Sequence, residues 1–119
     1  MEELRYLLLP LQGVALYVTT TRDRFLSEAQ GHVGGWVDVV SNALPDGTTV
    51  WVNDEGLLLG LDGNAWATLL FRRYLAGNLV VTGGVDEDGN TLSVNPALVA
   101  AVGKIITVWE VFSQLPIES

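Results

Sequence analysis

His32 is the only histidine of this 119-residue chain, and cysteine is absent, so nucleophilic chemistry has few residues to use. A Ser-His-Asp triad would have to include His32, but no Gly-x-Ser-x-Gly elbow accompanies it. His32 comes near the end of a predicted helix, where an imidazole interacts favourably with free carbonyl groups. Without cysteine, disulfides and thiolate metal sites are excluded as well. The sequence predicts no catalytic residue and no enzyme activity.

Carboxylates are the second candidates for chemistry. The run 86–90 (Asp-Glu-Asp-Gly-Asn) is similar to part of a calcium loop, but its glycine comes one position early and Ala97 replaces the bidentate glutamate. We interpret it as a charged turn. Asp54 and Glu55 are adjacent at the expected end of a strand, where they point to opposite sides and solvate a turn. We therefore expect no metal site and no cofactor.

Arg72 and Arg73 are the only concentrated positive charge. One interpretation is that they favour the negative end of a helix dipole. The other is an anion site that these arginines form across an oligomer, to which the aromatic face of Trp66 or Tyr74 would add in the case of a nucleotide. Neither Gly-x-Gly-x-x-Gly nor a P-loop pattern is present, so no phosphate cradle is indicated.

The charge balance limits the class of partner. The net charge is −8, and between Arg24 and Arg72 there are six acids and no lysine or arginine. Such a surface repels phosphate backbones, so we expect no direct binding of nucleic acid. Charged residues make up only 17% of the chain, against about 25% in typical domains. Because so few charges cover a monomer poorly, we expect a homo-oligomer.

The pattern of apolar residues predicts one domain, 1–119, of the α+β class: a single, mostly antiparallel sheet with two or three helices. We expect a hairpin of two strands, then a helix that ends at Gly34, and a second hairpin closed by the turn 44–47. A helix over 65–75 should pack Trp66, Leu69, Leu70 and Tyr74, and end at Gly77. The expected strands are 4–9, 14–20, 36–40, 48–53, 79–82 and 91–94.

After Asn95-Pro96, a strong helix start, apolar residues follow at helical spacing from Leu98 to Phe112. The β-branched run Ile105-Ile106-Thr107-Val108 would also suit a strand. We predict a helix over 97–112 and keep a strand over 104–112 as the alternative.

An internal duplication is a further hypothesis. A shift of 42 residues aligns 46–53 with 88–95 and Val39 with Val81, which would make two α-β-β units related by a pseudo-two-fold. The alternative is that hairpins favour Asp-Gly and β-branched residues at these places in any case. The two explanations stay open, and the sheet positions of Val39 and Val81 decide between them.

No targeting segment is visible. The start of the chain has no basic leader before an apolar core, and no apolar run reaches the roughly 18 residues of a membrane span. We expect a soluble protein that does not bind membranes.

Several short motifs carry a resemblance in their order and spacing. They are Gly-Gly-Trp-Val-Asp-Val at 34–39, Val-Asn-Asp-Glu-Gly at 52–56, Asn64 with Ala67-Thr68, and Gly-Asn-Leu-Val-Val at 77–81. Together they resemble a family of small uncharacterised domains of bacteriophages, plasmids and actinobacteria. The resemblance implies a small cytoplasmic protein of a mobile element or its host, with no activity to transfer. Its polar positions are Asn53, Glu55 and Asn64, which could also shape turns and cap a helix.

Three functions follow from these observations. The first is a non-enzymatic phage or mobile-element protein that binds a host factor, for example a defence component. A variant is an oligomeric sponge for a signalling nucleotide that uses Arg72, Arg73 and the ring of Trp66 or Tyr74. The second is an acidic DNA mimic that inhibits a nucleic-acid-binding enzyme, which needs carboxylates in a regular row. The third and weakest is a carboxylate-metal enzyme.

Overall fold

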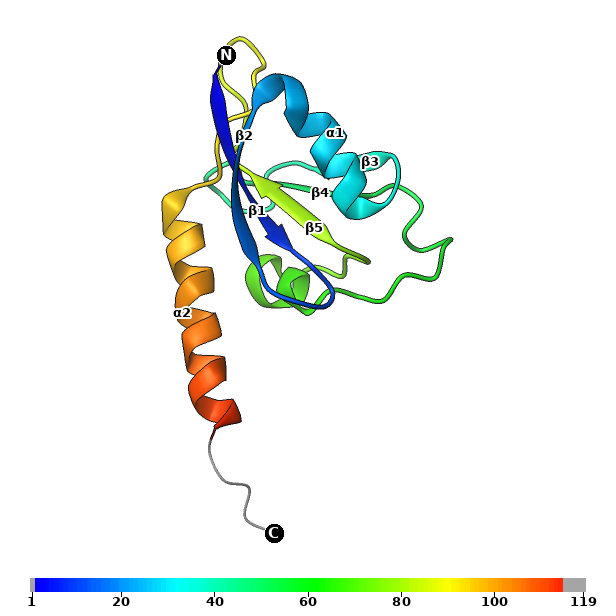
Figure 1. The fold of residues 1–119 in the computed structure, drawn as a ribbon. Coiled ribbons are helices and arrows are strands. Elements are labelled where there is room, and N and C mark those ends of the chain that lie inside the picture. The colour runs from blue at the N-terminus through cyan, green and yellow to red at the C-terminus, as the bar shows by residue number, and fades with distance from the viewer. Residues whose placement is uncertain (1, 115–119) are drawn as a thin grey trace.

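A computed structural model describes residues 2–114 as a five-stranded antiparallel sheet with helices on both faces (Figure 1). The spatial order of the strands is β2-β1-β5-β4-β3, so β2 and β3 form the two edges. The predicted α+β class is confirmed. In chain order the elements are β1 (Glu3–Leu9), β2 (Leu16–Thr21), α1 (Arg22–Val33), β3 (Val37–Val40), β4 (Thr49–Asn53), η1 (Ala67–Phe71), β5 (Leu79–Thr82) and α2 (Pro96–Ser113).

Both predicted hairpins form, because β1 pairs with β2 and β3 pairs with β4, each antiparallel. α1 follows the first hairpin and ends at Gly34. The φ of Gly34 is 81°, a left-handed conformation that costs glycine little. Since α1 connects one edge strand to the other, it crosses a whole face of the sheet and contacts all five strands (Figure 1).

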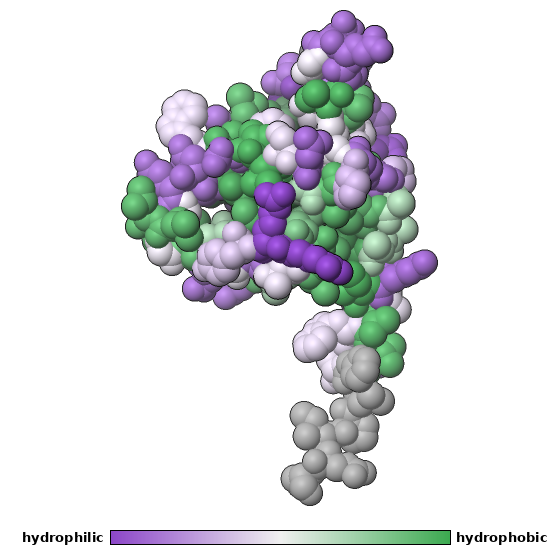
Figure 2. Space-filling view, turned by 180° about the vertical axis from the view of Figure 1, so that it is seen from behind, coloured by the Kyte–Doolittle hydropathy of each residue, from purple (hydrophilic) through white to green (hydrophobic). Residues whose placement is uncertain are grey.

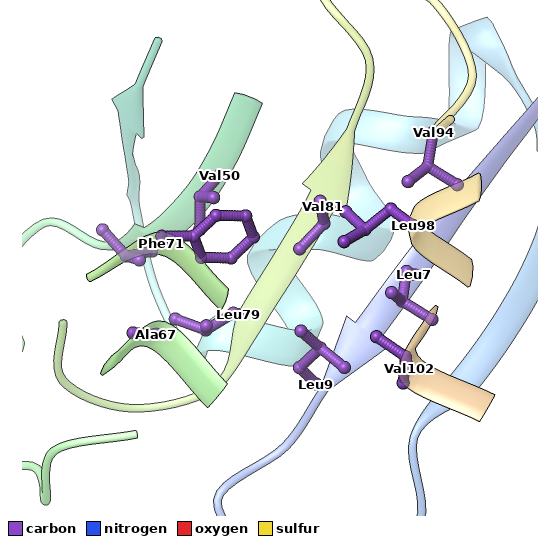
Figure 3. Packing of buried hydrophobic residues seen from close by; sticks show 11 residues of the cluster. Leu7, Leu9, Val50, Ala67, Phe71, Leu79, Val81, Val94, Leu98 and Val102 are labelled. Carbon is purple, nitrogen blue, oxygen red and sulfur yellow. The ribbon is translucent and has the colours of Figure 1, made fainter. Parts of the chain in front are cut away.

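The two faces of the sheet are buried by different elements. Alternating side chains of β1 and β5 point to opposite faces. Tyr6, Leu8 and Val80 pack under α1, against Phe25 and Ala29. On the other face, η1 and the first half of α2 cover the sheet (Figure 3). The buried residues drawn there include Leu7, Leu9, Val50, Ala67, Phe71, Leu79, Val81, Val94, Leu98 and Val102.

The prediction of a helix over 65–75 is wrong in length, and two of its four predicted packed residues do not pack. The helical segment ends at Phe71, in a π-turn, and Arg72 takes a left-handed conformation with a φ of 54°. The helix stops there because the chain must return beside residues 62–64. The N–H of Asn64 donates to Leu75 C=O at 2.8 Å, and Gly63 bridges Ala76.

This early end changes which side chains the helix buries. Phe71 is buried in the core, whereas Leu69 and Tyr74, which were expected to pack, are exposed. Trp66 and Leu70 pack against the core as predicted, and both stay partly exposed.

The duplication hypothesis is also wrong. Val39 lies on edge strand β3 and is exposed, whereas Val81 lies in central strand β5 and is fully buried. The predicted strand over 91–94, the counterpart of β4, is not a strand of the sheet. Thr91 forms a single bridge to Val85, and Val94 then donates its N–H to Arg5 C=O. The chain leaves β5 here because it pairs with the start of β1 instead.

α2 is a helix, as predicted, and the strand alternative over 104–112 is wrong. Asn95 caps it, with Oδ1 accepting the Ala97 N–H at 2.9 Å, and Pro96 occupies the first turn. Leu98 and Val102 are buried, but Trp109 is 71% exposed. The side chain of Phe112, the last of the helical series, lies outside the described residues. Within 2–114, no helix combines the length and apolar character of a membrane span.

Candidate functional site

A cleft of about 400 Å³ lies where β4 ends and the chain turns outward. Its lining comes from Asp38 of β3, from the end of β4 and the turn after Asn53, and from Tyr74 and the residues that follow it. Leu57 and Leu58 belong to the lining as well. The cleft thus joins segments from three parts of the chain, of which two belong to the motifs that carried the family resemblance.

Asn53 lines the cleft and holds the turn that follows it in place. Its side chain is buried, and its Nδ2 donates to Val33 C=O, the last residue of α1, at 3.0 Å. Its Oδ1 accepts the Glu55 N–H at 2.8 Å, which starts the turn. Asn53 therefore couples the end of α1 to the turn, and its polar atoms are used inside the fold rather than offered to a ligand.

The loop that follows is closed by its own backbone. Leu59 N–H donates to Glu55 C=O at 2.8 Å, and Leu61 N–H donates to Gly56 C=O at 2.9 Å. These turns fold the loop on itself, so its leucines have no core to enter. Leu57, Leu58 and Leu59 are 75%, 88% and 58% exposed. The loop between β4 and η1 forms an apolar protrusion, at the right of Figure 1 and the left of Figure 2.

Aromatic residues extend this apolar area. The Tyr74 ring is 67% exposed and lies over Gly63, where a Cβ atom would come within 2.6 Å of the ring. Trp36 is 73% exposed, and its C=O accepts the Asp54 N–H at 3.0 Å, which places it beside the turn. We call this set the leucine-loop surface. It consists of Trp36, Leu57, Leu58, Leu59 and Tyr74, with the carboxylates of Asp38, Asp54 and Glu55.

The electrostatics of the surface are one-sided. Asp38, Asp54 and Glu55 line the cleft, and its lining contains no lysine or arginine. The Asp38 carboxylate accepts the N–H of Val39 at 2.9 Å, and the other two carboxylates face solvent. A phosphate would meet three negative charges here, whereas an ammonium or guanidinium group would find acceptors.

The structure brings only part of the predicted site together. Asn53, Glu55 and Tyr74 meet at the cleft. Asn64 is 3% exposed; its Nδ2 donates to Leu9 C=O and Gly77 C=O, and its Oδ1 accepts the Trp66 N–H, each at 2.9 Å. Asn64 therefore caps the helix, one of its two expected roles, and also ties two strand ends together.

The remaining predicted residues lie apart from the cleft. Trp66 packs against the core. Arg72 and Arg73 are exposed after the early end of η1, and neither lines the cleft that holds Tyr74. The predicted combination of the two arginines with Tyr74 is therefore not assembled in this cleft.

Sequence reasoning missed Trp36, Asp38 and the three leucines. The signal for the leucines was present: an apolar run at 57–61 that starts and ends beside turn residues and matches neither a helical nor a strand period. A run of this kind, too short to form an element, preceded by Gly56 and interrupted by Gly60, is a candidate for an exposed contact loop. Trp36 gave no such signal, because its place at the strand start suits burial equally.

A second polar cluster lies under α1. The Tyr6 hydroxyl donates to Glu28 Oε1 at 2.8 Å and lies 2.9 Å from His32 Nε2. Thr20 Oγ1 donates to the other oxygen of Glu28. His32 lies in the last turn of α1, as expected, and its Nε2 also contacts Tyr6. Burial, followed by the nearby Glu28 carboxylate, raises the pKa of Tyr6 well above its usual value, so Tyr6 stays a neutral phenol and is no base.

Two further acids, Asp86 and Asp46, use their carboxylates within the fold. Asp86 Oδ1 accepts the N–H groups of Asp88 and Asn90, each at 2.9 Å, which confirms a charged turn at 86–90. Asp46 bonds Thr48 and Asn95. Among the residues described, no three His, Cys, Asp or Glu side chains gather as a metal site.

Comparisons with known proteins give one match. No curated protein and no solved structure matches the chain. A family model described as domain of unknown function DUF3846 matches residues 5–108, which include every strand except the first two residues of β1, and most of α2. The resemblance to a family of uncharacterised domains is thereby confirmed, and the chain belongs to the DUF3846 family.

Proposed function

We propose that this chain is a non-enzymatic binding protein that engages a partner protein through the leucine-loop surface. The observation that carries the proposal is the exposure of Leu57 and Leu58 on a loop closed by its own backbone hydrogen bonds. Contiguous apolar patches on soluble proteins mark contact sites. A loop that is already ordered also loses little conformational entropy on binding, which favours affinity.

The border of the surface defines the chemistry of the partner. Leu57 and Leu58 would fit an apolar pocket of the partner. Because Asp54 and Glu55 lie beside them, we expect lysine or arginine of the partner around that pocket. The exposed rings of Trp36 and Tyr74 accept cations on their faces. The partner surface is therefore apolar at its centre and basic at its rim. Charge attraction would then speed association with a chain of net charge −8.

The biological setting is part of the same proposal. The resemblance to domains of phages, plasmids and actinobacteria supports a mobile-element protein that acts in the bacterial cytoplasm. A host factor, for example a defence component, is then the partner. The nucleotide sponge and the DNA mimic stay predictions of lower rank. Arg72 and Arg73 do not line the cleft of Tyr74, and the acids Glu28 and Asp46 bond inside the fold instead of extending a row.

A capture experiment with matched variants tests the proposal. The full-length chain, Leu58→Ser and Leu26→Ser are immobilised and exposed to lysate of the bacterial host. Leu26 is an exposed leucine on the outer side of α1, so it controls for loss of any surface leucine. Each retained protein is purified and titrated by calorimetry against all three chains. We expect one retained protein to have a basic rim around its binding site and to bind the wild type and Leu26→Ser with equal affinity. The same protein should bind Leu58→Ser at least about 10-fold more weakly.

Two results would contradict the proposal. One is equal affinity of Leu58→Ser and Leu26→Ser for every retained protein. The other is a purified wild type that carries a small nucleotide, seen as extra mass in native mass spectrometry, and retains no protein. The second result would move the sponge to first place.

A further inference from the structure

The two edges of the sheet differ in how their backbone groups are satisfied. In an antiparallel strand, the N–H and C=O of one residue point to the same side, and successive residues alternate. Arg5 of β1 donates its N–H to Ser93 Oγ and accepts the Val94 N–H, both at 2.9 Å. The backbone N–H and C=O of Arg5 therefore point away from β2. Its partner in the ladder, Thr19, must then point its own N–H and C=O out of the sheet.

The same alternation fixes the rest of the β2 edge. The backbone N–H and C=O groups point out of the sheet at three residues, Tyr17, Thr19 and Thr21. The backbone groups of the residues between them, Leu16, Val18 and Thr20, bond to β1. Arg22 confirms this alternation, because its N–H donates to Glu2 C=O on the β1 side. Within residues 2–114, no hydrogen bond reaches the backbone groups of Tyr17 or Thr19 from the outer side. β2 thus presents an open row of donors and acceptors.

On β3, the other edge, one of the two outward backbone donors is already occupied. Trp36 C=O accepts the Asp54 N–H, so Trp36, Asp38 and Val40 bond to β4 while Val37 and Val39 point outward. The outward N–H of Val39 is already bonded to the Asp38 carboxylate at 2.9 Å. A charged side chain that occupies an edge donor is one of the devices that prevent strand addition.

β2 has no such device. The segment 14–21 contains no charged residue and no proline, and its residues are mostly β-branched or aromatic. Leu16 and Tyr17 are nearly half exposed. An uncharged six-residue edge strand is a template for pairing with another strand.

We propose that β2 pairs with β2 of a second copy, antiparallel about a two-fold axis, and joins two sheets into one of ten strands. Thr19 lies opposite Thr19 of the second copy, and Tyr17 lies opposite Thr21, so every outward residue meets an outward residue. Cross-strand threonine pairs are favourable. The net charge of −8 makes most approaches between copies repulsive, and this uncharged edge is a place where they can meet. The low charged fraction of the chain fits an oligomer in the same way.

The test changes the centre of the two edges in matched pairs. Thr19→Lys places a charge on the β2 edge, and Val39→Lys places the same charge on the β3 edge. Thr19→Pro removes an outward N–H without breaking a β1–β2 bond, and Val39→Pro is its control. The mass of each full-length variant is measured by light scattering during gel filtration, and circular dichroism checks that it is folded.

The proposal predicts a wild-type mass of twice 12.8 kDa, and the same for both Val39 variants. The Thr19 variants should be folded monomers. Hydrogen exchange gives a second readout, in which the Tyr17 and Thr19 amides of the wild type are protected. A monomeric wild type, or an oligomer that survives both Thr19 substitutions, would overturn the proposal. So would Tyr17 and Thr19 amides that exchange like those of an open loop.

Discussion

The leucine loop and the distal half of α2 are both exposed and apolar, yet their support differs. Leu57–Leu59 stand on turns closed by their own backbone and anchored through Asn53 to the end of α1. Val108 and Trp109 lie on a helix in which the buried side chains, among those that the structure describes, are Leu98 and Val102 near its start. The charges differ too: three carboxylates border the leucine loop, whereas Lys104 and Glu110 balance each other on α2. Exposure alone therefore marks no site, and a fixed backbone with a charged border makes the stronger case.

The largest expected effect on the free energy of unfolding comes from removing the hydrogen bonds of the Asn64 side chain, which follows the leucine loop in the chain. Asn64→Ala removes the side chain that bonds Leu9 C=O, Gly77 C=O and the Trp66 N–H, and leaves three buried groups unsatisfied. The free energy of unfolding should fall by about 3 kcal/mol or more. Urea denaturation followed by tryptophan fluorescence measures it. Asn95→Ala, at the α2 cap, is the comparison and should cost about 1 kcal/mol. Equal losses would mean that the two regions are supported alike.

A smaller effect separates the two halves of α2. Val102→Ala creates a cavity beside β1 and should cost about 2 kcal/mol. Trp109→Ser, on the distal half, should change the unfolding free energy by no more than about 0.5 kcal/mol, because exposed positions carry little packing energy. Thermal melts of the two variants test this difference. A loss for Trp109→Ser as large as that for Val102→Ala would show that the distal half is covered.

The smallest expected effect concerns the join between the β3–β4 turn and α2. Hydrogen bonds from the Thr48 hydroxyl, then from Asn95 Nδ2, lower the pKa of Asp46 below its usual value. Because this pKa is lowered on folding, the ionised carboxylate stabilises the fold at pH values above the unfolded pKa of about 4. This stabilisation is lost as the pH falls through the lower pKa of the folded state. The melting temperature of the wild type should exceed that of Asp46→Asn at pH 7, and the difference should shrink towards pH 3. A constant difference would contradict the linkage.

The strands and α1 could be predicted because local signals agreed with the final fold. The apolar run Leu4–Leu9 and the helix stop at Gly34 need no distant partner to be recognised. The early end of η1 could not be predicted, since the return of residues 74–76 beside 62–64 decides it. Val94 likewise left the expected hairpin because Arg5, distant in sequence, offered a backbone acceptor.

The candidate site was predicted only in part, for a related reason. Asn53 and Asn64 looked functional as polar motif positions, but their amides bond buried backbone groups. Leu57 and Leu58 looked like an unassigned link, because exposure is a property of the folded chain. Periodicity identifies side chains that are buried and gives no sign of an apolar residue that stays outside.

The central claim is that the leucine loop, and not α2, contacts the partner. Its most direct test is a photo-crosslinking amino acid placed at position 58 in one chain and at position 108 in another, each expressed in the proposed bacterial host. Both positions are exposed, so neither label disturbs the core. We predict that light attaches a protein with a basic, apolar surface at position 58 and no such protein at position 108. An adduct at position 108 with none at position 58 would contradict the account.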